Sequence, residues 1–293
     1  MSDSHYVLVT PAHNEEQTLG LAVAAVARQT LRPEHWVIVS DGSTDGTDAI
    51  IQKAAESHAF IRYLRREKGP GRSFSAKVQT LKAGVEVLKP LPFRFIGFMD
   101  ADITLEPSFF ESLLSRMSVD PRHGLGGGAI YEKAGGPWEL LKAQYSMSVA
   151  GAVQVFRREC YDETGGYIPL PYGGVDMAIE AMARMKGWTV KSFTDLKVYH
   201  HHLQGRTHGG RYRALFRRGM MEYVNGYHPL FQLARLFTWL RRSPILTASL
   251  LRTTGYFWAM LTRQPRAVPP ELIEFLAREQ KGRLWSRLKR ENG

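Results

Sequence analysis

The chain has 293 residues, of which 44% are hydrophobic, and it carries a formal net charge of +11. A chain of this length and composition can bury a full core, which excludes a disordered protein and suits one large domain or a domain with an appendage. The single cysteine, Cys160, excludes an internal disulfide and a zinc site built from cysteines. It agrees with a reducing cytosol and predicts a small buried side chain. The first residues show no basic segment before a long apolar run, so we expect no secretory signal.

The positive charge is concentrated in the C-terminal part. Residues 1–204 hold 22 Lys and Arg against 23 Asp and Glu, a net charge of −1, whereas residues 205–293 hold 17 against 5, a net charge of +12. A segment with this excess suits nucleic acid, anionic lipid or an acidic substrate. We therefore expect a main domain over residues 1–205 and a basic, aromatic helical extension over residues 206–293.

Short apolar runs alternate with amphipathic stretches in the first hundred residues. The sequence predicts strands and intervening helices there, with strands at 6–10, 36–40, 60–64 and 95–100 and helices near 18–29, 46–57 and 74–88. Repeated βα units predict an α/β fold with a Rossmann-like, doubly wound, mostly parallel sheet.

Three later segments also have a recognisable pattern. The glycine-rich stretch 124–130 predicts a close approach of the backbone to a ligand or a neighbour. Residues 153–167 predict a strand and a short helix that ends at Gly165. Residues 176–188 predict a helix that Lys186 and Gly187 end.

Acidic residues follow three of the predicted strands. Asp100 and Asp102 end an apolar run, and in an extended chain they project to the same side, where they can converge on one cation. An Asp-x-Asp pair alone is common, and two solvated acids before a helix that begins near Pro107 are the alternative. Asp41 follows the second strand, and Glu15 follows the first. Because open α/β sheets bind ligands at the carboxyl ends of their strands, we expect a polar binding site at this edge.

A long apolar segment, residues 243–261, lies in the basic C-terminal part. Arg252 near its centre makes crossing a bilayer unfavourable by about 2.5–3.5 kcal/mol. We expect a helix that lies in the membrane interface, with its apolar face in lipid and Arg252 near the headgroups. The alternative is an ordinary helix that packs its apolar stripe on the main domain.

Taken in order, seven motifs over about residues 6–226 resemble family 2 glycosyltransferases with the GT-A fold: TPAHNEE, VSDGSTDGT, GRSFSAK, MDAD, FRRECYDETGGY, GGVDMAIEAMARMKGW and VYHHH. Each motif alone is loose, and the ordered set is specific. The resemblance implies an inverting transfer of a sugar from a nucleotide donor, usually a UDP-sugar, with Mn²⁺ or Mg²⁺ as the cofactor. The acceptor would be a hydroxyl of a saccharide or lipid-linked saccharide in cell-envelope or extracellular polysaccharide assembly. We expect a cytoplasmic enzyme, peripheral on the anionic inner face of a membrane, with residues 1–205 as its catalytic domain.

The resemblance also assigns roles to single residues. It places Pro11 and Glu15 in the nucleotide pocket and Arg72 in contact with the nucleotide. It assigns Asp41 to the base and Asp100 to the ribose. Asp102, in the DxD motif, would hold the metal together with His200, although the neighbouring His201 and His202 leave that choice open. Asp176 would be the general base. The family's acidic pair appears here as Val175-Asp176, so only the second acid is present.

The chemistry of such a transfer suits these residue types. The diphosphate leaving group gathers negative charge that a divalent cation stabilises, and phosphate oxygens and waters complete the coordination of that cation. The acceptor hydroxyl must lose a proton, which calls for a carboxylate away from the metal. Without the resemblance, Asp176 would be expected only to cap its helix.

Three other functions fit parts of the sequence. A polyprenyl-phosphate glycosyltransferase needs little base catalysis, because its acceptor is a lipid phosphate. A nucleotidyltransferase shares a similar sheet but usually opens with a glycine-rich basic phosphate loop, which TPAHNEE is not. A nucleic-acid-binding protein would use the C-terminal charge, but the sequence has no recognition motif, so we expect no nucleic-acid partner.

Overall fold

The structure, a computed structural model, describes residues 5–67, 74–133, 135–141, 148–201, 210–240 and 246–291. The chain divides into two compact units. The first joins Met1–Pro169 with Met182–Gln204, and the second joins Leu170–Ala181 with Gly205–Gly293. The second unit therefore includes a short segment from within the expected main domain. The expected domain boundary between residues 205 and 206 stays a prediction.

A nine-stranded sheet forms the centre of the first unit, in the order β3-β2-β1-β4-β8-β6-β9-β5, with β7 paired to β6. The strands β1, β2, β3, β4, β6 and β9 run in one direction, and β5, β7 and β8 run in the other. Their bounds are β1 Tyr6–Ala12, β2 His35–Asp41, β3 Ile61–Arg66, β4 Phe95–Met99, β5 Ile103–Leu105, β6 His123–Glu132, β7 Glu139–Leu140, β8 Val153–Arg157 and β9 Thr189–His200. The predicted α/β fold with a mostly parallel sheet is confirmed.

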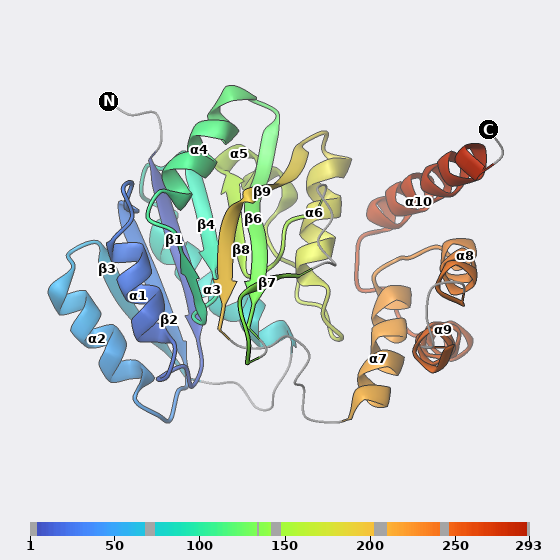
Figure 1. The fold of residues 1–293 in the computed structure, drawn as a ribbon, viewed down its shortest axis with the longest axis horizontal. Coiled ribbons are helices and arrows are strands. Elements are labelled where there is room, and N and C mark those ends of the chain that lie inside the picture. Colours follow the sequence, from blue (N-terminus) through green and yellow to red (C-terminus); the bar gives the residue numbers. More distant parts are fainter. Residues whose placement is uncertain are drawn as a thin grey trace. The chain divides into compact units, whose positions relative to one another are not determined.

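Helices pack on both faces of this sheet (Figure 1). They are α1 Leu19–Ala27, α2 Thr47–Ser57, α3 Phe74–Leu88, α4 Phe109–Val119 and α5 Arg158–Thr164. The next helix, α6 Val175–Met185, has its first residues in the second unit. Successive side chains of β1 show the two faces. Leu8 lies in the core cluster formed with α1 and α4, whereas Val9 lies against Gly84 of α3. The alternation along the strand thus produces the doubly wound arrangement.

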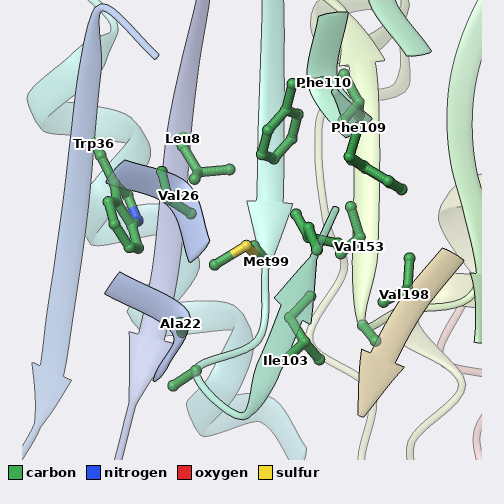
Figure 2. Packing of buried hydrophobic residues seen from close by; sticks show 14 of the residues in the cluster. Leu8, Ala22, Val26, Trp36, Met99, Ile103, Phe109, Phe110, Val153 and Val198 are labelled. Atoms are coloured by element: carbon green, nitrogen blue, oxygen red, sulfur yellow. The ribbon is translucent and has the colours of Figure 1, made fainter. Parts of the chain in front are cut away.

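A hydrophobic cluster lies between the sheet and the helices α1 and α4 (Figure 2). Trp36, Phe109 and Phe110 are fully buried in it. The indole Nε1 of Trp36 donates to Thr10 Oγ1 at 3.0 Å, so the polar atom of this large side chain keeps a partner. Cys160 is also buried, as the sequence predicts.

The glycine-rich stretch 124–130 lies within β6, between β8 and β9. A Cβ atom on Gly128 would lie 2.3 Å from the carbonyl oxygen of Leu196 and 2.7 Å from the ring of Phe109. The expected close approach of the backbone is therefore to neighbouring parts of the fold.

We expect Gly128→Ala to lower the free energy of unfolding by about 1–3 kcal/mol, because the methyl group must displace both a backbone carbonyl and an aromatic ring. Gly136→Ala is the matched control, since a Cβ atom there meets nothing within 4 Å. Urea unfolding followed by circular dichroism measures both variants. Equal midpoints for the two would contradict the close packing at β6.

The second unit contains helices α7 Arg211–Val224, α8 Pro229–Leu240, α9 Leu246–Leu261 and α10 Pro270–Glu291. The backbones of α7 and α9 pack closely: a Cβ atom on Gly219 would lie 1.9 Å from the carbonyl oxygen of Arg252, and one on Gly255 would lie 2.0 Å from that of Phe216. The helix expected over residues 243–261 is thus present from Leu246 onward, while residues 243–245 lie outside the described residues.

The expectation that Arg252 reaches lipid headgroups is wrong. Its side chain is buried, and its Nε donates to Glu222 Oε2 at 2.8 Å while its Nη2 contacts the other carboxylate oxygen. Arg235 Nη1 also donates to Glu222 Oε1 at 2.8 Å. The charge of Arg252 therefore has its partner inside the second unit, between α7 and α9. Across the described residues, we find no helix that is both long and apolar enough to span a bilayer.

Candidate functional site

The loops after β1 and β2 are hydrogen-bonded to each other. Asn14 Oδ1 accepts from the backbone N–H of Thr44 at 2.8 Å, and Glu16 Oε2 accepts from the backbone N–H of Gly46 at 2.9 Å. Asn14 adopts a φ of 57°, a left-handed conformation that Asn tolerates better than most residues. The two loops therefore form one connected rim at the carboxyl edge of the sheet.

Pro11 and Glu15 lie at the base of this rim. Pro11 is half-buried in β1 and pairs in register with Val39 of β2. The backbone N–H of Glu15 donates to Thr47 Oγ1 at 2.7 Å, and its carboxylate accepts from Thr18 Oγ1 at 2.9 Å. Glu15 thus connects the first loop to the starts of α1 and α2.

Asp41 ends β2 and is nearly buried. Its Oδ1 lies 3.3 Å from Arg66 Nη1, and the same nitrogen of Arg66 donates to Thr80 Oγ1 of α3 at 2.9 Å. A carboxylate in this position keeps its charge balanced by Arg66. Its oxygens are acceptors that suit the N–H groups of a nucleobase.

Asp100 follows β4 directly and forms an ion pair with α3, in which Lys77 Nζ lies 2.6 Å from its Oδ1. Burial raises the pKa of the Asp100 carboxyl; Lys77 opposes this effect, and the negative charge of Asp102 adds to it. Lys77 is one turn before Thr80 in α3, so a single helix face reaches the surroundings of both Asp100 and Asp41.

Asp102, His200 and Glu132 form a nearly buried chain of contacts at the same edge. Asp102 Oδ2 lies 3.1 Å from His200 Nε2, and Glu132 Oε1 lies 3.2 Å from His200 Nδ1. Burial by itself lowers the pKa of His200, but the hydrogen bonds and charges of the two carboxylates outweigh it and raise the pKa to about 8. The strand register, which places Ile103 opposite His200, brings these groups together.

The side chain of His201 has contacts of its own. Its Nε2 lies 3.0 Å from Thr104 Oγ1, and its ring centroid lies 5.3 Å from that of Trp138. Its backbone N–H donates to the carbonyl oxygen of Asp102 at 2.8 Å. His202 lies outside the described residues.

Among the residues that the structure describes, no group of three or more His, Cys, Asp and Glu side chains could hold a metal by itself. Asp102 and His200 nevertheless offer a carboxylate oxygen and an imidazole nitrogen 3.1 Å apart. Two ligands with bonds of about 2.1 Å to one cation are separated by a similar distance. The pair therefore fits a divalent cation whose remaining ligands come from a bound substrate or water.

Asp176 lies in the first turn of α6, in the segment that groups with the second unit. It follows Gly173 and Gly174, which have φ values of 92° and 82°. The Asp176 side chain is half-buried and makes no hydrogen bond or ion pair with any other described residue, so the capping role is not observed there. The predicted nucleotide residue Arg72 lies outside the described residues.

Sequence reasoning assigned no role to three charged residues that contact the expected site: Lys77, Glu132 and Arg66. Lys77 stands in the motif GRSFSAK, and Glu132 ends the glycine-rich strand, at the same edge as the acidic loops. The position of Glu132 at a strand end is a signal that could have identified it. The partner of each residue is distant in the sequence and depends on the fold.

The fold and this acidic edge define the GT-A class of glycosyltransferases. The chain resembles a mannosyltransferase from Pyrobaculum calidifontis in complex with GDP-Man and Mn²⁺, with a TM-score of 0.55, 16% identity and coverage of 91% of this chain and 77% of that one. It also resembles S. aureus TarS residues 1–349 in complex with UDP-GlcNAc, with a TM-score of 0.57, 16% identity and coverage of 93% and 84%.

The chain belongs to glycosyl transferase family 2, whose model matches residues 7–169, more than half of its length. Similar proteins include the dodecaprenyl-phosphate galacturonate synthase of Rhizobium johnstonii, 29% identical over 38% of this chain and 31% of that protein. The chondroitin synthase of Escherichia coli is 28% identical over 38% of this chain and 15% of that protein. The match thus spans less than a third of the length of these curated relatives.

Proposed function

We propose that the protein transfers a sugar from a nucleotide donor, a UDP-sugar, to an acceptor hydroxyl with inversion, in the cytoplasmic assembly of cell-envelope or extracellular polysaccharide. The convergence of Asp41, Asp100 and the Asp102–His200 pair at one edge of the sheet carries this proposal. It is supported by solved neighbours of the same fold whose complexes contain UDP-GlcNAc or GDP-Man.

In this proposal the nucleoside lies against the rim formed by the first two loops. Asp41 accepts a hydrogen bond from the base, and Asp100 accepts from the ribose hydroxyls, with Lys77 holding its carboxylate in place. Pro11 and Glu15 form the wall of the pocket, and Arg72 contacts the nucleotide.

Mn²⁺ or Mg²⁺ would be held by Asp102 and His200, with diphosphate oxygens and waters as the other ligands. When bound, the cation would stabilise the negative charge on the departing diphosphate. Glu132 accepts from His200 Nδ1, which would orient the ring so that Nε2, 3.1 Å from Asp102 Oδ2, is the nitrogen that coordinates after releasing its proton to water. A neighbour complexed with Mn²⁺ supports a divalent cation.

Asp176 is the proposed general base that accepts the proton of the acceptor hydroxyl. A carboxylate without a bound partner among the described residues is available for that task. The acceptor would be a saccharide or a lipid-linked saccharide.

A polyprenyl-phosphate acceptor is the second candidate, and the similarity to a dodecaprenyl-phosphate galacturonate synthase favours it. A phosphate oxygen is already deprotonated at neutral pH, so this reaction would not require Asp176. The two candidates therefore differ in their dependence on one residue.

We expect UDP to bind at least tenfold more tightly with Mn²⁺ or Mg²⁺ than in EDTA, because a cation held by Asp102 and His200 would attract the negatively charged diphosphate. Asp102→Asn should remove most of this metal dependence. Asp195→Asn is the matched control, since Asp195 pairs with Arg116 on the surface of the same unit. Calorimetry of the three proteins measures the effect, and equal UDP affinity in EDTA and Mn²⁺ would argue against the metal bridge.

The donor is identified by a thermal-shift screen of nucleotide sugars with and without Mn²⁺, because a ligand that binds only the folded state raises its melting temperature. Stabilisation by a UDP-sugar above that by UDP alone supports the proposal. Stabilisation confined to GDP-linked or CDP-linked sugars would replace the proposed donor.

A further inference from the structure

The helix α9 buries an arginine and exposes three large apolar side chains. The inward face carries Arg252, Thr253 and Ser249 beside Tyr256 and Ala259, all buried in the second unit. The outward face carries Leu250, Trp258 and Leu261, with 61%, 54% and 76% of each residue exposed. Leu250 and Trp258 are separated by about two turns, and Leu261 follows one turn later, so the three share a face. Helices that face water normally have the opposite arrangement.

The neighbouring helix α8, which packs against α9, also exposes leucines and buries a polar side chain. Gln232 is buried in the unit, whereas Leu230 and Leu233 are exposed. A single exposed leucine is ordinary on a protein surface, but large exposed apolar side chains on two adjacent helices require an explanation.

The exposed charges on the described residues of α7, α8 and α9 and of the turn after α9 are all positive. Glu222 is the only acid between residues 205 and 270, and it is 1% exposed and bonded to Arg235 and Arg252. Among the described basic residues of this region, Arg213, Arg218 and Arg263 are exposed. The described residues of α7, α8 and α9 therefore expose apolar and positively charged groups and no carboxylate.

We propose that the outward face of α9, defined by Leu250, Trp258 and Leu261, lies in the interface of an anionic lipid membrane. The leucines and the indole would enter the boundary between headgroups and acyl chains, and the exposed arginines would contact lipid phosphates. The helix has 16 residues, fewer than the roughly 20 needed to cross a bilayer, so it would lie along the surface.

The charge distribution favours lipid over a second copy of the chain. Two copies meeting through this face would bring arginine-rich surfaces together without any exposed acid of α7, α8 or α9 to balance them. An anionic membrane instead supplies the opposite charge and the apolar layer at once. The proposal concerns attachment and is independent of the sugar that the enzyme transfers.

Flotation of the full chain with phosphatidylcholine vesicles that contain 30% phosphatidylglycerol tests the proposal. We expect Leu250→Ser/Leu261→Ser to lower the partition coefficient at least tenfold, because two exposed side chains lose their burial in lipid. The matched control is Leu21→Ser/Val119→Ser, which alters two exposed apolar residues of the first unit and should float like the parent. Pure phosphatidylcholine vesicles should bind the parent weakly.

Quenching by brominated lipids gives a second measurement that does not depend on the leucine variants. We expect the parent to be quenched and Trp258→Phe to lose most of that quenching, because the indole of Trp258 would be at the depth of the bromine atoms. A folded double serine variant that floats like the parent would overturn the proposal, as would quenching unchanged in Trp258→Phe. A parent that is dimeric and a double serine variant that is monomeric, with neither bound to vesicles, would assign the face to a second copy instead.

Discussion

Asp176→Asn should lower the rate of sugar transfer by about 10²–10⁴ while leaving UDP affinity unchanged, because general-base assistance contributes an effect of that size. The substitution keeps the size of the side chain and removes only its ability to accept a proton. The Asp176 carboxylate makes no hydrogen bond with another described residue, so its loss should not disturb packing. Turnover with the true acceptor and UDP affinity must be measured on the same preparation.

Asp102→Asn provides the contrast for this measurement. It should weaken metal-assisted donor binding as well as turnover, whereas Asp176→Asn should affect turnover alone. A rate close to that of the parent for Asp176→Asn would show that the base assignment is wrong. A phosphate acceptor, which needs no general base, would then be the better proposal.

The order of strands and helices in the first unit follows from local patterns. Apolar runs such as residues 36–40 and 95–99 lie buried in β2 and β4, and Gly165 and Gly187 follow the ends of α5 and α6 with φ values of 71° and 84°. Apolar runs and helix-ending glycines depend only on residues that are close together in the chain, so a single sequence is enough to predict them. The edge position of Asp41 and Asp100 follows from the same reasoning, because parallel strands end together.

The contacts that arrange the site depend on residues far apart in the sequence. The family resemblance points to His200 but leaves His201 and His202 open, whereas the pairing of β5 with β9 places His200 beside Asp102. Lys77 contacts Asp100, which is 23 residues away in the sequence, and Glu132 contacts His200, which is 68 residues away. No periodicity in the sequence encodes these pairs.

Arg252 illustrates the same limit in the second unit. In the sequence Arg252 interrupts an apolar segment. A charged side chain at such a position is expected to reach water or lipid headgroups. The partner of Arg252, Glu222, is 30 residues away in α7 and accepts from it inside the unit. The apolar pattern of residues 246–261 correctly predicts a helix, but the face that packs inward is the one that carries the charge.

Glu222→Ala should lower the free energy of unfolding by about 3–5 kcal/mol, because it leaves Arg252 buried without its carboxylate and removes a partner of Arg235. Glu86→Ala is the matched control: its carboxylate lies 3.9 Å from Lys89 Nζ, both side chains are 69% exposed, and such surface pairs contribute only about 0–1 kcal/mol. Urea unfolding followed by circular dichroism compares the two variants.

A second substitution separates the loss of an ion pair from a general loss of packing at this position. Glu222→Ala/Arg252→Met removes the buried positive charge that Glu222→Ala leaves behind, and replaces it with an apolar side chain that fills much of the same space. We expect this double variant to recover part of the lost stability. Equal effects of Glu222→Ala and Glu86→Ala would show that Arg252 reaches water in solution. Failure of the double variant to recover stability would attribute the loss to the cavity left at Glu222.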